Sequence, residues 1–203
     1  MNRETFFNEV RKEIFGGSLK QNQVSGLSTL LDYAEKNLSG WDKRWLAYAL
    51  ATAYHETAHS KKYWPFIGRG YVQLTWDYNY DKYGIKNNPD KALEPAFAAY
   101  VLYDGMAKGV FTGKKLSDYF SNKVDDPKGA RRVVNGTDKA DLIATYHKKF
   151  LAAILDSQDA VEAPVKPVQP DVIVLEPTAP AEPQNPWWAL LRALIGVFFG
   201  KAK

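Results

Sequence analysis

The segment from Asp42 to about Ala58 constrains the fold more than any other part of this 203-residue chain. Its middle, Trp-Leu-Ala-Tyr-Ala-Leu at residues 45–50, is apolar on nearly every side of the helix that its composition favours. A helix of this kind is normally surrounded by other elements. We therefore expect it at the centre of the domain, with Asp42 as its N-cap.

Apolar residues also recur at helical spacing on both sides of this segment. They predict helices over residues 6–15, 24–35, 95–108 and 138–154, and shorter ones over 114–120 and 127–134. Asp138 is expected to cap the last long helix, whose inward stripe should be Leu142, Tyr146, Phe150 and Ile154. Residues 71–76 alternate with a period of two, which indicates a strand or one arm of a hairpin. The sequence thus predicts a mainly α domain with a small β-hairpin.

The composition changes after residue 158. Prolines then fall at intervals of three, at 164, 167 and 170 and again at 177, 180, 183 and 186, which favours an extended tether. Residues 187–203 follow as a hydrophobic tail. As a helix its apolar part would span about 20 Å, short of the roughly 30 Å of a hydrocarbon core. We expect a catalytic domain over 1–158, a Pro-rich linker over 159–186, and a short C-terminal helix whose residues 187–200 lie on a membrane surface or dock on protein.

Composition excludes several classes of function. The net charge of +4 is too small to argue for a nucleic-acid partner. There is no cysteine, so neither disulfides nor thiolate chemistry is available. Charged residues interrupt residues 1–17, so we expect no signal peptide and synthesis in the cytoplasm. No cofactor and no metal is expected.

Glu56 is the candidate catalytic residue, because it ends the long apolar helix. A carboxyl group partly removed from water keeps its proton more readily, which suits a general acid that protonates a glycosidic oxygen. The alternative is a surface glutamate at a helix end. Gly68 and Gly70, a little further along, allow the backbone to turn sharply or to approach a ligand.

The two faces of the predicted strand differ in chemistry. Tyr71, Gln73 and Thr75 should point one way and offer polar groups to sugar hydroxyls, while Val72, Leu74 and Trp76 should anchor the strand in the core. Eight aromatic residues lie between Tyr63 and Tyr83, and a few of these rings could line a cleft that holds a sugar chain.

The same region also contains the zinc-protease pattern H-E-x-x-H, formed by His55, Glu56 and His59. A third ligand is missing where the longer form of this pattern requires a histidine, since that position is Pro65. Lys62 replaces the required glycine. We therefore place a metalloprotease behind a sugar-cleaving enzyme.

Several segments resemble glycoside hydrolase family 19, most closely its phage and prophage endolysin branch. They are His-Glu-Thr at 55–57, Gly-Arg-Gly-Tyr-Val-Gln-Leu-Thr-Trp at 68–76, Asn-Tyr at 79–80, Phe-Thr-Gly-Lys-Lys-Leu-Ser at 111–117 and Ala-Arg-Arg-Val-Val-Asn-Gly at 130–136. The resemblance covers roughly residues 5–155. It implies a lysozyme-like α+β fold and cleavage of β-1,4 bonds in peptidoglycan or chitin.

The resemblance also implies roles for particular residues. Glu56 matches the general acid, and Thr75 matches a Ser or Thr that helps to hold the attacking water. Gln73, Asn79 and Asn135 match substrate-binding positions. His55 and Tyr71, which belong to the same motifs, are expected to bind substrate as well.

One feature of that family is missing here. Its second glutamate, the general base, normally lies in a longer loop before the Gly-Arg-Gly segment, whereas residues 57–67 contain no acidic residue. Thr75 and Asn79 could position water without a strong base, Asp77 or Asp81 could substitute, or the chain could mainly bind. A mechanism with a single glutamate, as in lytic transglycosylases, is also open.

We expect a glycosidase of the endolysin or muramidase type that acts on the cell wall once the membrane is breached. A chitinase and a non-catalytic wall-binding module are the alternatives.

Overall fold

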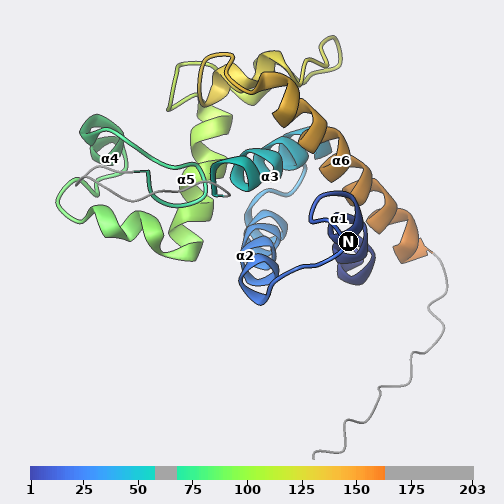
Figure 1. Ribbon diagram of the computed structural model, residues 1–203. Coiled ribbons are helices and arrows are strands. Elements are labelled where there is room, and N and C mark those ends of the chain that lie inside the picture. Colours follow the sequence, from blue (N-terminus) through green and yellow to red (C-terminus); the bar gives the residue numbers. More distant parts are fainter. Residues whose placement is uncertain (58–67, 163–203) are drawn as a thin grey trace, which may run out of the picture. The chain divides into compact units, whose positions relative to one another are not determined.

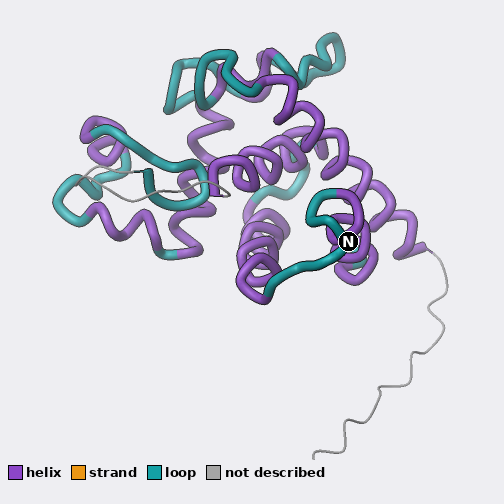
Figure 2. The backbone as a smooth tube through the Cα atoms, in the orientation of Figure 1, coloured by secondary structure: helices purple, strands orange, loops and turns teal. Residues whose placement is uncertain are grey.

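The computed structural model describes residues 1–57 and 68–162, and Met1–Val165 forms one compact unit. The described part is mainly helical, as predicted (Figures 1 and 2). Its α-helices are α1 (Arg3–Glu13), α2 (Gln21–Asn37), α3 (Lys43–Thr57), α4 (Asp77–Lys82), α5 (Pro95–Lys108) and α6 (Ala140–Glu162). Its 3-10 helices are η1 (Pro89–Leu93), η2 (Leu116–Asp118) and η3 (Gly129–Val133).

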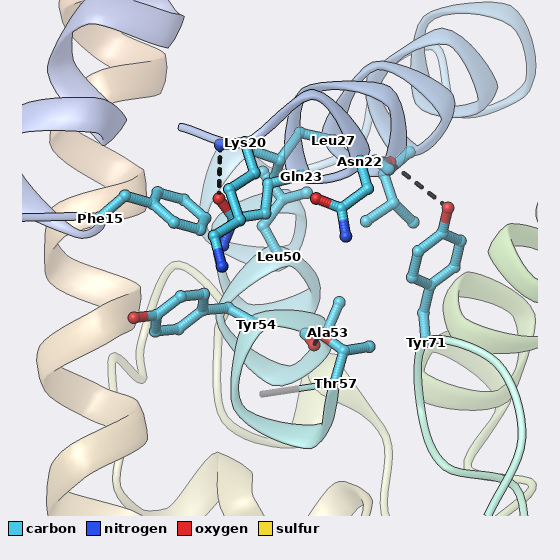
Figure 3. A pocket seen from close by; sticks show the side chains of 12 residues that line it. Phe15, Lys20, Asn22, Gln23, Leu27, Leu50, Ala53, Tyr54, Thr57 and Tyr71 are labelled. Atoms are coloured by element: carbon cyan, nitrogen blue, oxygen red, sulfur yellow. Dashed lines mark hydrogen bonds between the residues drawn. The ribbon is translucent and has the colours of Figure 1, made fainter. Parts of the chain in front are cut away.

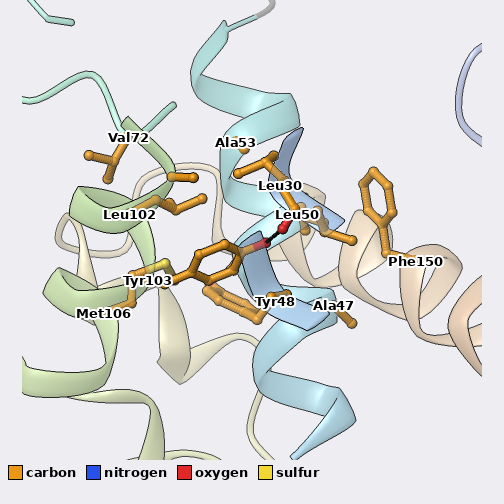
Figure 4. Packing of buried hydrophobic residues seen from close by; sticks show 14 of the residues in the cluster. Leu30, Ala47, Tyr48, Leu50, Ala53, Val72, Leu102, Tyr103, Met106 and Phe150 are labelled. Atoms are coloured by element: carbon orange, nitrogen blue, oxygen red, sulfur yellow. Dashed lines mark hydrogen bonds between the residues drawn. The ribbon is translucent and has the colours of Figure 1, made fainter. Parts of the chain in front are cut away.

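Helix α3 is the centre of the domain, as its composition predicts. It packs against α6, α5 and α2, and five consecutive residues, 47–51, are fully buried (Figure 4). Tyr48 and Leu50 pack there with Tyr103 of α5 and Phe150 of α6. Asp42 caps the helix, because its Oδ1 accepts a hydrogen bond of 2.8 Å from the backbone N–H of Arg44. The helices packed around α3 hold its C-terminal end in place, and with it Glu56.

The boundaries of α5 agree with the prediction and those of α6 do not. Helix α5 begins at Pro95 and stops at Gly109, whose φ of 73° is left-handed. Helix α6 begins only at Ala140, after Lys139 with φ 58°, so Asp138 does not cap it. It also continues to Glu162, past residue 158.

The inward stripe of α6 is shifted by one residue from the predicted one at its N-terminal end. Leu142 is 41% exposed, whereas Ile143 and His147 are buried together with Phe150 and Ile154. The prediction counted apolar residues only, and it therefore missed a histidine that occupies a core position.

The predicted β-hairpin is wrong. Residues 71–76 form no strand, and the part of the chain that the structure describes contains only two isolated β-bridges. One of them joins Arg69 to Leu74 through backbone hydrogen bonds of 2.9 and 3.2 Å, which close a tight turn. Gln73 (φ 53°) and Trp76 (φ 68°) are left-handed, and such residues break the two-residue alternation. Val72 and Leu74 are buried as expected, but Trp76 is 65% exposed.

The Pro-rich linker from residue 163 onward and the hydrophobic tail lie outside the described residues. Within residues 1–57 and 68–162, none of the helices combines the length and the apolar character needed to cross a bilayer.

Candidate functional site

A cleft of about 450 Å³ lies at the C-terminal end of α3. This volume is within the range of roughly 300–1,000 Å³ that is usual for ligand sites. Its walls come from five separate stretches of chain, namely Glu56 of α3, residues 72–76, Tyr78 and Asn79 of α4, Phe111 and Thr112, and residues 134–136. The buried packing of α3 and the turn that ends at Leu74 bring these stretches together.

Glu56, which lines the cleft, pairs with Arg131, which does not. Arg131 Nη1 donates a hydrogen bond of 2.8 Å to Glu56 Oε1, and the two side chains are only 4% (Arg131) and 19% (Glu56) exposed. Arg131 Nε donates to the backbone carbonyl of Asp138 at 3.0 Å, so both sides of the guanidinium are held. The planar guanidinium therefore fixes the orientation of the carboxylate.

The position of Glu56 near a helix end gives Arg131 an electrostatic role. The last carbonyl groups of α3 carry a partial negative charge, which disfavours a carboxylate in the last turn. The guanidinium of Arg131 offsets that repulsion. Glu56 Oε2 has no hydrogen-bond partner among the described residues, so it is the oxygen that remains open to a ligand.

Thr75 offers the clearest polar group for a ligand. It is half-buried and lines the cleft, and its hydroxyl makes no hydrogen bond within the described residues. A free hydroxyl in this position can hold water or a sugar hydroxyl.

Three amide side chains also line the cleft, but some of their nitrogen and oxygen atoms already form hydrogen bonds within the protein. Asn79 is buried, donates to the carbonyl of Thr75 at 2.9 Å and accepts from Lys82 Nζ at 3.3 Å. Gln73 Nε2 donates to the carbonyl of Gly70 at 3.1 Å. Asn135 is exposed, and its Oδ1 accepts from the N–H of Gly136. Asn79 thus supports Thr75, while Asn135 keeps its amide N–H groups for a ligand.

Two exposed aromatic rings stand at the same cleft. Trp76 is 65% exposed and Tyr78 is 52% exposed, and Lys82 Nζ lies 5.3 Å from the centre of the Tyr78 ring. Exposed aromatic faces beside hydroxyl and amide groups suit the apolar and polar faces of sugar rings.

His55 and Tyr71 lie elsewhere. Neither is among the residues that line this cleft. The His55 ring is 6.5 Å from that of Tyr146 on α6, and Tyr71 lines a second cavity. The structure therefore brings together Glu56, Gln73, Thr75, Asn79 and Asn135 of the predicted site residues.

Neither candidate for a second carboxylate reaches the cleft. Asp77 is exposed and pairs with Lys86 at 3.1 Å, and this hydrogen-bonded ion pair lowers the pKa of Asp77. Asp81 is exposed and does not line the cleft either. Among the described residues that form the walls, Glu56 is the only acidic one.

The zinc-protease pattern extends beyond the part of the chain that the structure describes. His59 lies outside it, and within residues 1–57 and 68–162 no group of three His, Cys, Asp or Glu side chains is arranged to hold a metal ion.

Sequence reasoning missed the part that Arg131 plays. This residue stands in the Ala-Arg-Arg-Val-Val-Asn-Gly segment, where only Asn135 was assigned a role. Two adjacent arginines in an otherwise apolar stretch were the available signal, because one of them must be buried if that stretch packs against the core. Comparison with protein families, with curated proteins and with solved structures finds no match to this chain.

Proposed function

We propose that the chain is a glycosidase that cleaves β-1,4 bonds of peptidoglycan, with Glu56 as the general acid. The observation that carries this proposal is a single half-buried carboxyl group in a cleft with hydroxyl, amide and aromatic walls. Such walls suit a polysaccharide, and one carboxyl group can supply the proton that the leaving oxygen needs. No cofactor is required for this chemistry.

Glu56, its partner Arg131 and four polar residues of the cleft have parts in the proposed reaction. Arg131 occupies Glu56 Oε1 and leaves Oε2 to hold the proton and pass it to the glycosidic oxygen. Thr75 holds the water that attacks the sugar carbon and then releases its proton to solvent, and Asn79 supports Thr75 through the backbone carbonyl of Thr75. Gln73 and Asn135 bind hydroxyl or acetamido groups of the sugar.

The resemblance to glycoside hydrolase family 19 supports the same assignment. It predicts a lysozyme-like domain, and the mainly helical fold with a cleft at the end of its central helix is compatible with one. Chitin oligomers are the alternative substrate, because their backbone carries the same linkage.

A non-catalytic wall-binding module is the second candidate. The observation that favours it is that the cleft holds one carboxylate, already engaged by Arg131, and no second acidic side chain from the described residues. Inverting hydrolysis normally uses two carboxyl groups roughly 6.5–9.5 Å apart. A measurement of catalytic turnover distinguishes the glycosidase from the wall-binding module.

The proposed setting is a protein made in the cytoplasm that acts on the cell wall after the membrane is breached. Residues 187–200 would bring it to a membrane surface. Flotation with liposomes tests this part, since the whole chain should float and a chain that ends at Val165 should not. Equal flotation of both would contradict it.

The decisive experiment for activity is a turbidity assay on permeabilised Gram-negative cells. Wild type should clear the suspension, and Glu56→Gln should not, although its circular dichroism spectrum shows that it is folded at the assay temperature. A strong chelator should leave wild-type clearing intact, and loss of clearing with chelator would favour the metalloprotease. Substantial clearing by Glu56→Gln would contradict the proposed role.

A further inference from the structure

A second cavity of about 390 Å³ lies between the end of α1, the start of α2 and the end of α3. Figure 3 shows Lys20 and Gln23 on its α2 side, Tyr54 of α3 below them and Tyr71 across from them. Leucines from α2 and α3 contribute its apolar part. Nothing in the proposed reaction uses this cavity.

The cavity and the cleft share two stretches of chain. Thr57 lines the cavity and directly follows Glu56, which lines the cleft. Tyr71 lines the cavity and directly precedes Val72 and Gln73 of the cleft. The two sites are thus formed by adjacent residues at two points of the chain, an arrangement that suits a branched substrate whose backbone lies in the cleft.

The charge of the cavity is positive. Lys20 is its one ionised side chain among the described residues, and no acidic residue of that part of the chain lines it. The ammonium group of Lys20 forms no salt bridge within residues 1–57 and 68–162. An ammonium group without an acidic partner, beside amide and hydroxyl groups, suits a ligand that carries a carboxylate.

Chitin and peptidoglycan differ in charge and in branching. Chitin is a neutral linear chain, whereas peptidoglycan carries a short acidic peptide on alternate sugars. We propose that this cavity binds the acidic peptide stem of peptidoglycan, with Lys20 pairing with a stem carboxylate. This inference rests on the proposed function, and it selects peptidoglycan over chitin.

The sharpest test is co-sedimentation of the Glu56→Gln protein with an insoluble polysaccharide, because it measures binding whether or not turnover occurs. One sample is intact peptidoglycan, and the other is chitin, which carries no peptide stems. Lys20→Glu, added to Glu56→Gln, should weaken binding to peptidoglycan about fivefold to tenfold and leave binding to chitin unchanged. Lys20→Gln should have a smaller effect in the same direction.

Lys36→Glu is the matched control, because it makes the same charge reversal on the same helix about 24 Å away. It should leave both affinities unchanged. Folding should survive Lys20→Glu, since an acidic residue is favourable at the N-terminal end of a helix. Equal weakening on both materials, or no weakening on either, would overturn the inference. Failure of the proposed function would appear separately, as an absence of turnover by the wild type.

Discussion

Arg131 is the residue on which the candidate site depends most. It connects α3 to the segment after η3 through Glu56 and the carbonyl of Asp138, and it is almost completely buried. A buried guanidinium keeps its charge, so it remains favourable only while both partners stay in place. Removal of its side chain would leave Glu56 facing the end of α3 without compensation.

We therefore expect Arg131→Ala to lower the free energy of unfolding by about 2–3 kcal/mol, from the loss of a buried pair and of packing volume. Its neighbour Arg132 is exposed, so Arg132→Ala should cost less than about 0.5 kcal/mol. Urea denaturation of the two variants measures the difference. Equal stabilities would show that the Arg131–Glu56 pair does not support the fold.

His147 gives the domain a dependence on pH. Burial lowers the pKa of His147 to about 4, against an ordinary value of 6.5, although nearby Asp125 acts in the opposite direction. Its ring stacks on Phe120 with centroids 5.1 Å apart. Between pH 6.5 and 4 the unfolded chain binds a proton at this site and the folded chain does not, so stability falls as the pH falls.

By pH 4, the titration of His147 alone should have lowered the free energy of unfolding by roughly 3 kcal/mol. His147→Gln, which cannot titrate, should therefore lose less stability than wild type between pH 6.5 and pH 4. Denaturation curves at several pH values measure both slopes. If the free energy of unfolding of the wild type falls with pH no more steeply than that of the variant, the burial of a neutral imidazole is contradicted.

At the scale of elements, the turn from Gly68 to Trp76 builds one wall of the cleft. Gly70 adopts φ +68°, and a Cβ atom there would come within 2.5 Å of the carbonyl oxygen of Ala92. The turn is thus pressed against η1, and this contact sets the position of Gln73 and Thr75. Glycine is required here both by the left-handed backbone and by the lack of space.

Gly70→Ala should consequently destabilise the domain by more than about 2 kcal/mol, since strain and a backbone clash add. Gly84 has a similar φ of +66°, but a methyl group there would meet nothing within 4 Å. Gly84→Ala therefore adds backbone strain without a clash and should lower the free energy of unfolding by about 1 kcal/mol. Thermal unfolding of both variants provides the comparison. A Gly84→Ala variant at least as unstable as Gly70→Ala would contradict this account of the turn.

The same turn shows how far sequence reasoning reaches. Helix α3 was predictable from its continuous apolar stretch and its Asp42 cap, and α5 from the proline in its first turn. The turn was predicted as a strand because alternation alone cannot reveal left-handed residues such as Gln73. Glu56 could be selected from its place at the end of α3, whereas its partner Arg131 lies 75 residues away and is found only by folding the chain.

At the scale of the whole molecule, one compact unit places two cavities around the end of its central helix. The cleft holds the carboxyl group and the polar groups proposed for cleavage of a glycan. The second cavity holds an ammonium group suited to an acidic branch. Together they fit the proposed substrate, a branched, acidic polysaccharide.

The most direct test of this account is mass analysis of the soluble products released from purified peptidoglycan by wild type and by Glu56→Gln. Wild type should release disaccharide-peptides with new reducing sugar ends, as expected for attack by water held at Thr75, and Glu56→Gln should release none although its circular dichroism spectrum shows that it is folded. Equal release by the variant, or release of free peptides from an uncut glycan, would contradict the central claim that Glu56 cleaves the sugar chain.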